Sequence, residues 1–231
     1  MKEVYENYEL HANAPSREEL KSISRTYSKI FGEFLPKDKQ SKILDIGCGY
    51  GAFIYFLKNK GYKKYWGIDL SKEEINFCKK NISNNVSVEN IFNFLKKNKD
   101  YDLIVANHLM EHLPKKELLE MLIEIRKSLG KNGKLMLQVP NTSNPFSLSS
   151  RYIDITHEIG FTQNSLLEIL RVARFKEVKI NGILSEGSLK AQIRNFVSRK
   201  MMYPLTKLAF VLQGFGAPKY LEPKLIGVAE K

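Results

Sequence analysis

The sequence predicts an α/β fold built on a doubly wound parallel sheet. Apolar, strand-like segments alternate with helical segments over most of the chain. The first strand-like run, 42–47, leads into a glycine turn and an apolar helical segment, and Asp69 ends the second run at 64–69. Because parallel strands present their carboxyl ends at one edge of such a sheet, a ligand is expected at that edge.

The alternation defines the elements of the core. Strands are expected near 42–47, 64–69, 86–89, 101–106 and 133–139, and helices near 51–60, 72–82, 91–97 and 115–129. Helical periodicity is clear over 115–126, and Gly130 and Gly133 flank the expected turn into the fifth strand. A further helix and two strands are expected over 165–174, 175–181 and 225–229.

The glycine turn is the most informative segment. Gly47, Gly49 and Gly51 have the spacing G-x-G-x-G, whereas the usual dinucleotide fingerprint is G-x-G-x-x-G. Asp45 precedes the first glycine, and this acid disfavours a pyrophosphate ligand. Asp69, which lies 18 positions after Gly51, is placed to accept hydrogen bonds from ribose hydroxyls. Together these features indicate an adenosine ligand without phosphate groups.

Four motifs in this order resemble those of the class I S-adenosylmethionine-dependent methyltransferases. They lie at 45–51, 67–71, 90–95 and 101–113, so the resemblance covers residues 40 to 141. It implies a Rossmann-like sheet of seven strands with an antiparallel last strand, S-adenosyl-L-methionine as the cofactor and S-adenosyl-L-homocysteine as the product. Asn90 stands where the family usually has Asp, and its amide can still bond to the adenine amino group. The implied cofactor contacts are Asp45, Gly47, Cys48, Gly49, Gly51, Asp69, Leu70, Asn90, Ile91 and Asn107.

An N-terminal segment, 1–40, precedes the first strand. Ser16 and Glu19 form a capping box for a helix that is expected to end near Pro36. In the family such a helix often covers the cofactor as a lid, and the alternative is a helix that packs on the sheet. Three residues before this helix are of interest, namely Tyr5, Tyr8 and His11. They either contact the cofactor or the acceptor, or they belong to a disordered tail.

The rest of the chain divides into a cofactor-binding core over 41–182 with an acceptor loop at 142–164, an insertion at 183–224 and a last core strand over 225–231. The insertion is basic and amphipathic, and Pro204 is expected to interrupt it. Two alternatives are open for this insertion. It lies on a membrane surface, or it packs against protein, as a cap over the acceptor site or as a dimer face. Arg174, just before the sixth strand, stands where the family usually has a turn glycine, so the local geometry there is expected to differ.

Methyl transfer is an in-line displacement at a sulfonium, so the protein must hold an acceptor atom about 3 Å from the methyl group. A hydroxyl acceptor would benefit from a general base, and the candidates are the four histidines, His11, His108, His112 and His157. We expect His157 and His108 in catalysis. Thr156-His157 resembles a motif of small-metabolite methyltransferases, and His108 directly follows the fourth strand. His112, more often a structural hydrogen-bonding residue in this family, is expected to contact the acceptor.

The acceptor loop supplies the other expected contacts. Arg151, Tyr152 and Asp154 are neighbours of His157 in the sequence, and Arg151 suits a phosphate or carboxylate on the acceptor. No cluster of residues has convincing metal-ligand spacing, so no metal is predicted. The expected partner is therefore a small anionic polar substrate.

Composition places limits on the setting. The 231 residues carry a formal net charge of +12, which favours anionic partners, although the lysines are scattered. No run of 18 uncharged apolar residues occurs, and the first residues lack the apolar core of a signal peptide. Cys48 and Cys78 show no metal or redox spacing, which fits a reducing compartment. We expect a cytoplasmic monomer or homodimer without stable membrane insertion, with at most peripheral membrane contact.

The leading hypothesis is O-methylation of a sugar nucleotide or a phosphate-type capsule decoration. It rests on the segment 141–175, which with the basic insertion resembles methyltransferases of bacterial capsule and lipopolysaccharide biosynthesis. The alternatives are a quinone-precursor O-methyltransferase, an RNA methyltransferase and a binding module without activity. No nucleic-acid partner is expected, because the chain shows no added RNA-binding module and Asn107 does not begin an Asn-Pro-Pro-Tyr-type motif.

Overall fold

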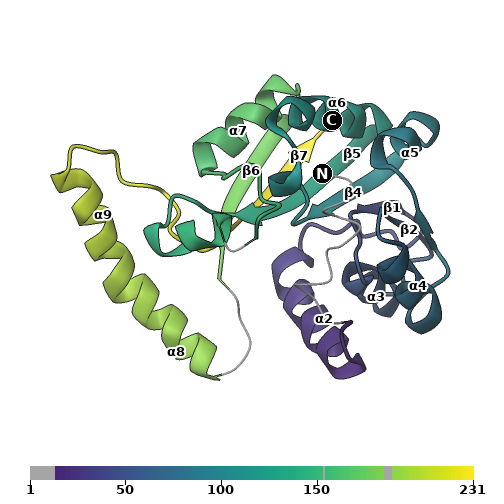
Figure 1. Cartoon of the computed structure of the whole chain (residues 1–231), viewed down its shortest axis with the longest axis horizontal. Helices are drawn as coiled ribbons and strands as arrows, with labels where there is room; N and C mark the ends of the chain where they lie inside the picture. The colour runs from purple at the N-terminus through teal and green to yellow at the C-terminus, as the bar shows by residue number, and fades with distance from the viewer. Residues whose placement is uncertain (1–13, 153, 185–188) are drawn as a thin grey trace.

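The computed structural model describes residues 14–152, 154–184 and 189–231. The expectations for Tyr5, Tyr8 and His11 lie outside these residues, as does the first third of the predicted N-terminal segment. Within the described part the chain forms one seven-stranded sheet with helices on both faces, and two further helices stand apart from it (Figure 1).

The sheet has the strand order β3-β2-β1-β4-β5-β7-β6. Its strands are β1 (Lys42–Ile46), β2 (Lys64–Asp69), β3 (Val86–Val88), β4 (Tyr101–Asn107), β5 (Leu129–Pro140), β6 (Lys176–Ile183) and β7 (Lys224–Glu230). The first five strands pair in parallel, whereas β7 runs antiparallel to both β5 and β6. The predicted fold, a Rossmann-like sheet with an antiparallel last strand, is confirmed.

The core lies on both faces of the sheet because its central strands are apolar at consecutive positions. In β4, Leu103 and Val105 pack on one face and Ile104 and Ala106 on the other. The helices of the first face are α2 (Arg17–Phe31), α3 (Ala52–Asn59) and α4 (Lys72–Asn81), and those of the second are α5 (Ile91–Lys97), α6 (Lys115–Ser128) and α7 (Gln163–Val172). The helices cover the two faces of the sheet, so a ligand is expected at its edge, where β1, β2 and β4 have their carboxyl ends.

Helix α2 begins as predicted, with the Ser16–Glu19 capping box, but it ends at Phe31 and not near Pro36. Gly32 is the C-cap of the helix, with φ of −56° and ψ of −38°, and an added Cβ there would lie 2.3 Å from the carbonyl oxygen of Ser28. Phe31 is fully buried and its ring packs edge-on against Phe53 of α3, with ring centroids 5.7 Å apart. The helix therefore belongs to the packed layer on this face of the sheet.

The start of β5 also differs from the prediction. The strand begins at Leu129, directly after α6, so Gly130 and Gly133 lie inside it and not in a turn before it. Its pairing with β4 shifts register there, because Tyr101 is opposite Leu129 while Leu103 is opposite Lys134. An added Cβ at Gly133 would lie 2.5 Å from the Tyr101 carbonyl oxygen, so the bulge requires glycine.

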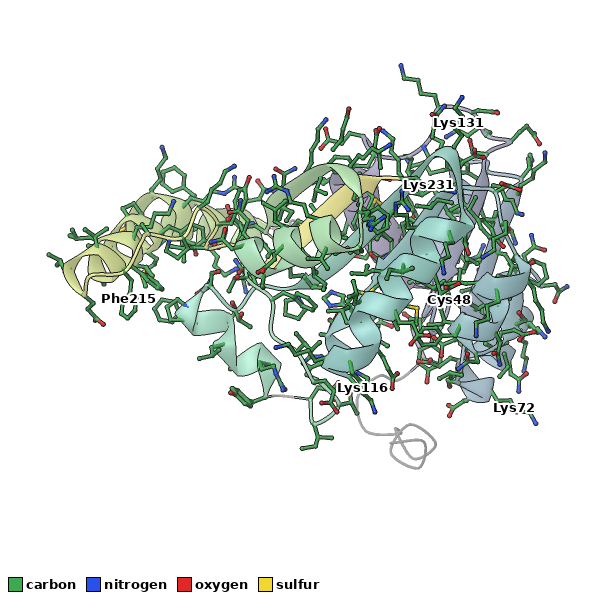
Figure 2. All side chains as sticks on the ribbon, turned by 90° about the horizontal axis from the view of Figure 1, so that it is seen from above. Cys48, Lys72, Lys116, Lys131, Phe215 and Lys231 are labelled. Atoms are coloured by element: carbon green, nitrogen blue, oxygen red, sulfur yellow. The ribbon has the colours of Figure 1, made fainter. Side chains whose placement is uncertain are left out.

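The insertion forms one rod, made of α8 (Leu189–Val197), a π-helical segment η3 (Ser198–Met202) and α9 (Tyr203–Leu212). Pro204 does not interrupt it, contrary to the prediction. A proline in a regular helix clashes with the carbonyl four residues earlier, and the wider π-helical turn directly before Pro204 relieves that clash. The rod projects from the sheet domain, and Phe215 marks the chain just beyond its outer end, far from Cys48 in the core (Figure 2).

Arg174 adopts a left-handed backbone conformation, with φ of 65°, in the turn from α7 to β6. The sequence already marked this position as one where a glycine is usual. An L-residue in this conformation has a backbone free energy about 1–2 kcal/mol higher than glycine would have. Glycine recovers only part of this difference, because it also gives the unfolded chain more backbone entropy. The turn is therefore a point of stored backbone strain.

We predict that Arg174→Gly raises the free energy of unfolding by about 0.5–1 kcal/mol, since it removes this strain. Arg171→Gly, in the last turn of α7, is the matched control and should lower it by about 1 kcal/mol, because the residue is helical. Urea unfolding of both variants measures the difference. Equal destabilisation by the two substitutions would contradict the strain assignment.

Candidate functional site

The glycine turn lies at the carboxyl end of β1 and leads into α3. Gly47, Gly49 and Gly51 all have positive φ, at 69°, 52° and 82°. At Gly51 packing adds to the positive φ, because an added Cβ would lie 2.3 Å from the sulfur of Cys78. At Gly49 an added Cβ meets nothing closer than 3.7 Å, so this backbone is open to a ligand.

Asp69 ties the glycine turn to the end of β2. Its Oδ2 accepts a hydrogen bond from the Gly49 N–H at 2.9 Å, and its Oδ1 accepts one from the Ser71 N–H at 2.9 Å. A carboxylate has about four acceptor positions, so these two bonds leave acceptor capacity for ribose hydroxyls. The predicted ribose-binding acid therefore also orders the turn that faces the ligand.

Two further acids surround the turn. Burial, and secondarily the charge of Asp69, raises the pKa of Asp45 well above its usual value. Burial, followed by the charges of Asp69 and Glu73, raises the pKa of Glu74 to about 7. Burial favours the protonated forms of both acids, and a positively charged ligand next to them would favour the ionised forms instead. A sulfonium cofactor supplies such a charge.

The other predicted cofactor contacts follow the same edge. Leu70 is exposed beside Asp69, Ile91 is buried, and Asn90 caps α5 by accepting the Asn93 N–H at 3.2 Å. Cys48 is buried, and burial raises the pKa of its thiol, so it is a packing residue. Leu70 and Asn90 are exposed at this edge, and the contacts of all four residues with an adenosine stay predictions.

Asn107 ends β4 next to the glycine turn, since Asp45 and Val105 are register partners in the adjacent strands. Its side-chain amide is buried, and neither Oδ1 nor Nδ2 has a hydrogen-bond partner among the described residues. Leaving a buried amide unpaired costs about 1–3 kcal/mol. A ligand that donates to and accepts from this amide removes the cost.

The turn after β4 carries a histidine with both ring nitrogens engaged. His108 Nδ1 lies 2.9 Å from Oε1 of Glu111, and the Gln138 amide nitrogen donates to its Nε2 at 2.5 Å. In this arrangement Nδ1 carries the proton and donates to Glu111. His108, predicted to be catalytic, is thus placed to orient Glu111, which the sequence analysis did not assign to the site.

His112 contacts the acceptor loop from the short helix η1 (Met110–His112). Its Nδ1 lies 2.7 Å from Oγ1 of Thr156, whose hydroxyl donates to Oδ1 of Asp154 at 2.7 Å. Because that hydroxyl proton points to Asp154, His112 Nδ1 is the donor and Nε2 carries the lone pair. Burial lowers the pKa of His112, which favours this neutral form.

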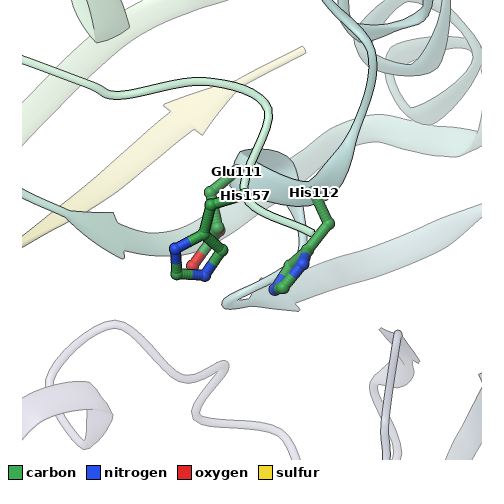
Figure 3. A group of neighbouring side chains, drawn as sticks. All are labelled: Glu111, His112 and His157. Carbon is green, nitrogen blue, oxygen red and sulfur yellow. The ribbon is translucent and has the colours of Figure 1, made fainter. Parts of the chain in front are cut away.

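The ring of His157 lies against that of His112, with centroids 4.7 Å apart, and Glu111 lies beside both (Figure 3). The structure thus brings together three predicted site residues from two segments of the chain. His112 comes from η1, and Asp154 and His157 come from the acceptor loop. Asp154 Oδ2 lies 4.0 Å from His157 Nε2. An added Cβ at Gly47 would lie 3.0 Å from Leu109, so this turn packs directly against the glycine turn.

The other two predicted acceptor contacts lie further along the same loop. Arg151 donates from Nη2 to the Glu158 carbonyl oxygen at 2.8 Å, and its guanidinium stacks on Tyr152, 5.4 Å from the ring centroid. Tyr152 is 75% exposed. The pair forms a polar rim on the acceptor loop, with guanidinium donors left for an anion.

The sequence profile of the methyltransferase-domain family matches residues 17–195, which is most of the chain. The chain belongs to this family. The match runs from α2 through the glycine turn, the histidine turn and the acceptor loop into α8. The fold and the family assign this methyltransferase the cofactor S-adenosyl-L-methionine, and the open Gly49, Asp69 and the unpaired Asn107 amide fit it.

Individual relatives match a shorter part of the chain than the family profile does. A carboxy-S-adenosyl-L-methionine synthase of Actinobacillus pleuropneumoniae serotype 7 is 28% identical over 125 residues, 51% of this chain and 52% of the relative. A ribosomal protein L11 methyltransferase of Lactobacillus gasseri is 36% identical over 103 residues, 42% of this chain and 31% of the relative. The methyltransferase thus matches about half, or less, of the length of these relatives.

A solved structure shows the same fold over nearly the whole chain. The S-adenosylmethionine-dependent methyltransferase of Archaeoglobus fulgidus has a TM-score of 0.65 and 24% identity, and the match covers 90% of this chain and 94% of that one. No helix in the described part of this methyltransferase has the length and hydropathy needed to cross a membrane.

We predict that the contribution of Glu74 to the stability of the unliganded protein is lost as pH rises from about 4.5 to about 7. In this window folded Glu74 stays largely protonated, with its pKa at about 7, while the unfolded residue ionises near its ordinary pKa of 4.5, so the folded state binds more protons. Glu74→Gln should therefore flatten the pH dependence of the melting temperature between pH 5 and 7. Glu120→Gln, exposed on α6, is the control, and a Glu74→Gln curve parallel to wild type would contradict the assignment.

Proposed function

We propose that this methyltransferase transfers the methyl group of S-adenosyl-L-methionine to an oxygen of a small polar acceptor that carries a phosphate or nucleotide. A sugar nucleotide or the precursor of a phosphate-type capsule decoration has this chemistry. The observation that supports the proposal most is the cluster of Glu111, His112 and His157 beside the glycine turn. Imidazoles next to a methyl donor suit an acceptor that must lose a proton.

Each part of the site has a place in this reaction. The cofactor brings an activated methyl group on a sulfonium, and the acids around the glycine turn stabilise its positive charge. Asn107 orients the cofactor or the acceptor through its buried amide. His157 acts at the acceptor oxygen, His112 positions it, and His108 holds Glu111 in place. Methyl transfer then requires only that the acceptor oxygen is aligned with the methyl–sulfur bond.

The acceptor class is inferred from charge. Arg151 offers guanidinium donors on the rim of the loop, and the chain has a net charge of +12, so an anionic acceptor is attracted. Such acceptors are made in the cytoplasm, where we place the reaction. The fold itself does not select a substrate. A quinone precursor is the second candidate, because the exposed apolar side chains of the α8–α9 rod suit a membrane-bound acceptor.

Label transfer from S-adenosyl-L-methionine tests the proposal. The purified protein is incubated with methyl-labelled cofactor and a cell extract divided into small metabolites, lipids and RNA. We expect label in the small polar fraction, and we expect His157→Ala to reduce it at least about 100-fold while cofactor affinity stays unchanged. Glu158→Gln, an exposed neighbour in the same loop, is the control variant.

The other outcomes discriminate among the alternatives. Label that enters only the lipid fraction would favour the quinone precursor, and label only in RNA would favour an RNA methyltransferase. Full activity of His157→Ala in the small-metabolite fraction would remove His157 from the reaction, although the acceptor class would stand.

A further inference from the structure

Three side chains from two separate segments converge at the acceptor side of the site. Glu111 and His112 lie on η1, and His157 comes from the acceptor loop 45 positions later. Each offers a ligand atom, and these atoms all lie within 4.8 Å of one another (Figure 3). Two imidazoles and a carboxylate are a common ligand set for divalent transition metals.

Glu111 gives the independent sign of a missing ligand. The residue is 1% exposed, and its Oε1 lies 2.9 Å from His108 Nδ1. Its Oε2 is buried and has no hydrogen-bond partner among the described residues. A buried carboxylate oxygen without a partner is unfavourable, and a cation between this oxygen and the two imidazoles would supply one.

The surroundings orient the imidazoles as metal ligands require. His112 donates from Nδ1 to Thr156, so its Nε2 lone pair is the one that can coordinate. Asp154 supports both histidines, because it accepts from Thr156 and lies 4.0 Å from His157 Nε2. Metal-binding histidines commonly have a carboxylate behind them in this way.

We propose that Glu111, His112 and His157 bind a divalent transition-metal cation such as Mn²⁺ or Zn²⁺. Ligand atoms about 2.1 Å from one cation lie about 3–3.4 Å apart, so the side chains need to close by roughly 1.5 Å. Imidazole ligands favour these cations over Mg²⁺ and Ca²⁺, which prefer oxygen. Three protein ligands leave coordination positions open for a substrate.

The role of the cation rests on the proposed function. An acceptor hydroxyl that coordinates the cation has a lowered pKa and releases its proton to solvent, so with the cation bound His157 acts on the acceptor oxygen through the metal and not as a general base. The resulting alkoxide forms the oxygen–carbon bond as the carbon–sulfur bond breaks. Its negative charge and the positive charge of the sulfonium cancel, so a neutral methyl ether and a neutral thioether result. The open positions would also bind a second oxygen of a diol or phosphate.

Metal binding can be measured without any acceptor. Protein treated with a chelator and desalted is titrated calorimetrically with Mn²⁺, and separately with Zn²⁺, each in the presence and absence of S-adenosyl-L-methionine. We expect one equivalent to bind to wild type, and binding weakened at least about tenfold in His157→Ala and Glu111→Gln. Glu158→Gln should bind like wild type, and cofactor affinity reports that each variant is folded.

The possible results test the cation site and the proposed acceptor class independently of each other. Absence of stoichiometric binding, or equal binding by His157→Ala and Glu158→Gln, would overturn the site and leave only adventitious surface binding. Site-dependent binding together with label that enters only lipid would keep the cation site and reject the small polar acceptor. Methylation that is equally fast in chelated and metal-loaded protein would reject the proposed role of the cation.

A second, independent observation concerns the α8–α9 rod. Between residues 187 and 221 the sequence contains no Asp or Glu but six cations, Lys190, Arg194, Arg199, Lys200, Lys207 and Lys219. Large apolar side chains recur among them at helical spacing, and all of them are exposed by 39–77%. These are Ile193, Phe196, Val197, Met201, Met202, Leu205, Leu208, Val211, Leu212 and Phe215.

The geometry points to an anionic lipid surface as the partner of this rod. The rod stands apart from the sheet domain, so the domain does not cover these apolar side chains (Figures 1 and 2). An amphipathic helix that is rich in cations binds in the membrane interface through apolar burial and attraction to anionic lipids. The absence of acids complements such a surface, whereas two copies of the rod would bring like charges together.

Vesicle flotation tests this surface. We expect the full chain to float with vesicles that contain phosphatidylglycerol and not with phosphatidylcholine alone. Arg199→Gln with Lys200→Gln should weaken binding about 25-fold, at about fivefold for each cation. Lys79→Gln with Lys80→Gln, exposed on α4, is the charge-matched control. Equal loss in the control, or a stable dimer that Leu205→Ser with Leu208→Ser dissociates in place of lipid binding, would overturn the proposal.

Discussion

The site depends above all on the two hydrogen bonds that Asp69 accepts from Gly49 and Ser71. They fix the glycine turn against the end of β2, although the turn itself has three residues with positive φ. Without this anchor the bare backbone at Gly49 would not keep one orientation toward a ligand. The same carboxylate adds to the effect of burial in raising the pKa of Asp45 and Glu74, so Asp69 contributes to both the geometry and the electrostatics of this side of the site.

The acceptor side depends on a different link. The carbonyl oxygen of Glu111 accepts from the backbone N–H groups of Glu158 and Ile159, at 2.8 and 3.1 Å. These bonds dock the acceptor loop onto the turn after β4, and they bring His157 to His112. Because Leu109 of the same turn packs at Gly47, the acceptor loop is held near the glycine turn through one short segment. Two distant parts of the sequence thus become one site.

Local patterns explain what the sequence predicted well. Strands and the glycine turn depend on the residues within them, so all seven strands and the placement of Asp69 followed from runs of apolar residues and glycine spacing. The errors came from interactions beyond the pattern. Helix α2 ends at Phe31, with Gly32 as its C-cap, before Pro36, and a π-helical turn carries the rod through Pro204. Glu111 was not assigned to the site because the acceptor loop that meets it, at His157, Glu158 and Ile159, lies far away in the sequence.

Buried acids around a cofactor cost stability in the unliganded protein, and this cost has a functional consequence. Burial disfavours Asp45 and Glu74 as anions, and we propose that a sulfonium bound beside them gains affinity that the uncharged thioether of the product lacks. After methyl transfer the positive charge on sulfur is gone, and the acids again favour protonation. The arrangement that destabilises the empty site therefore favours release of S-adenosyl-L-homocysteine and exchange for a new methyl donor.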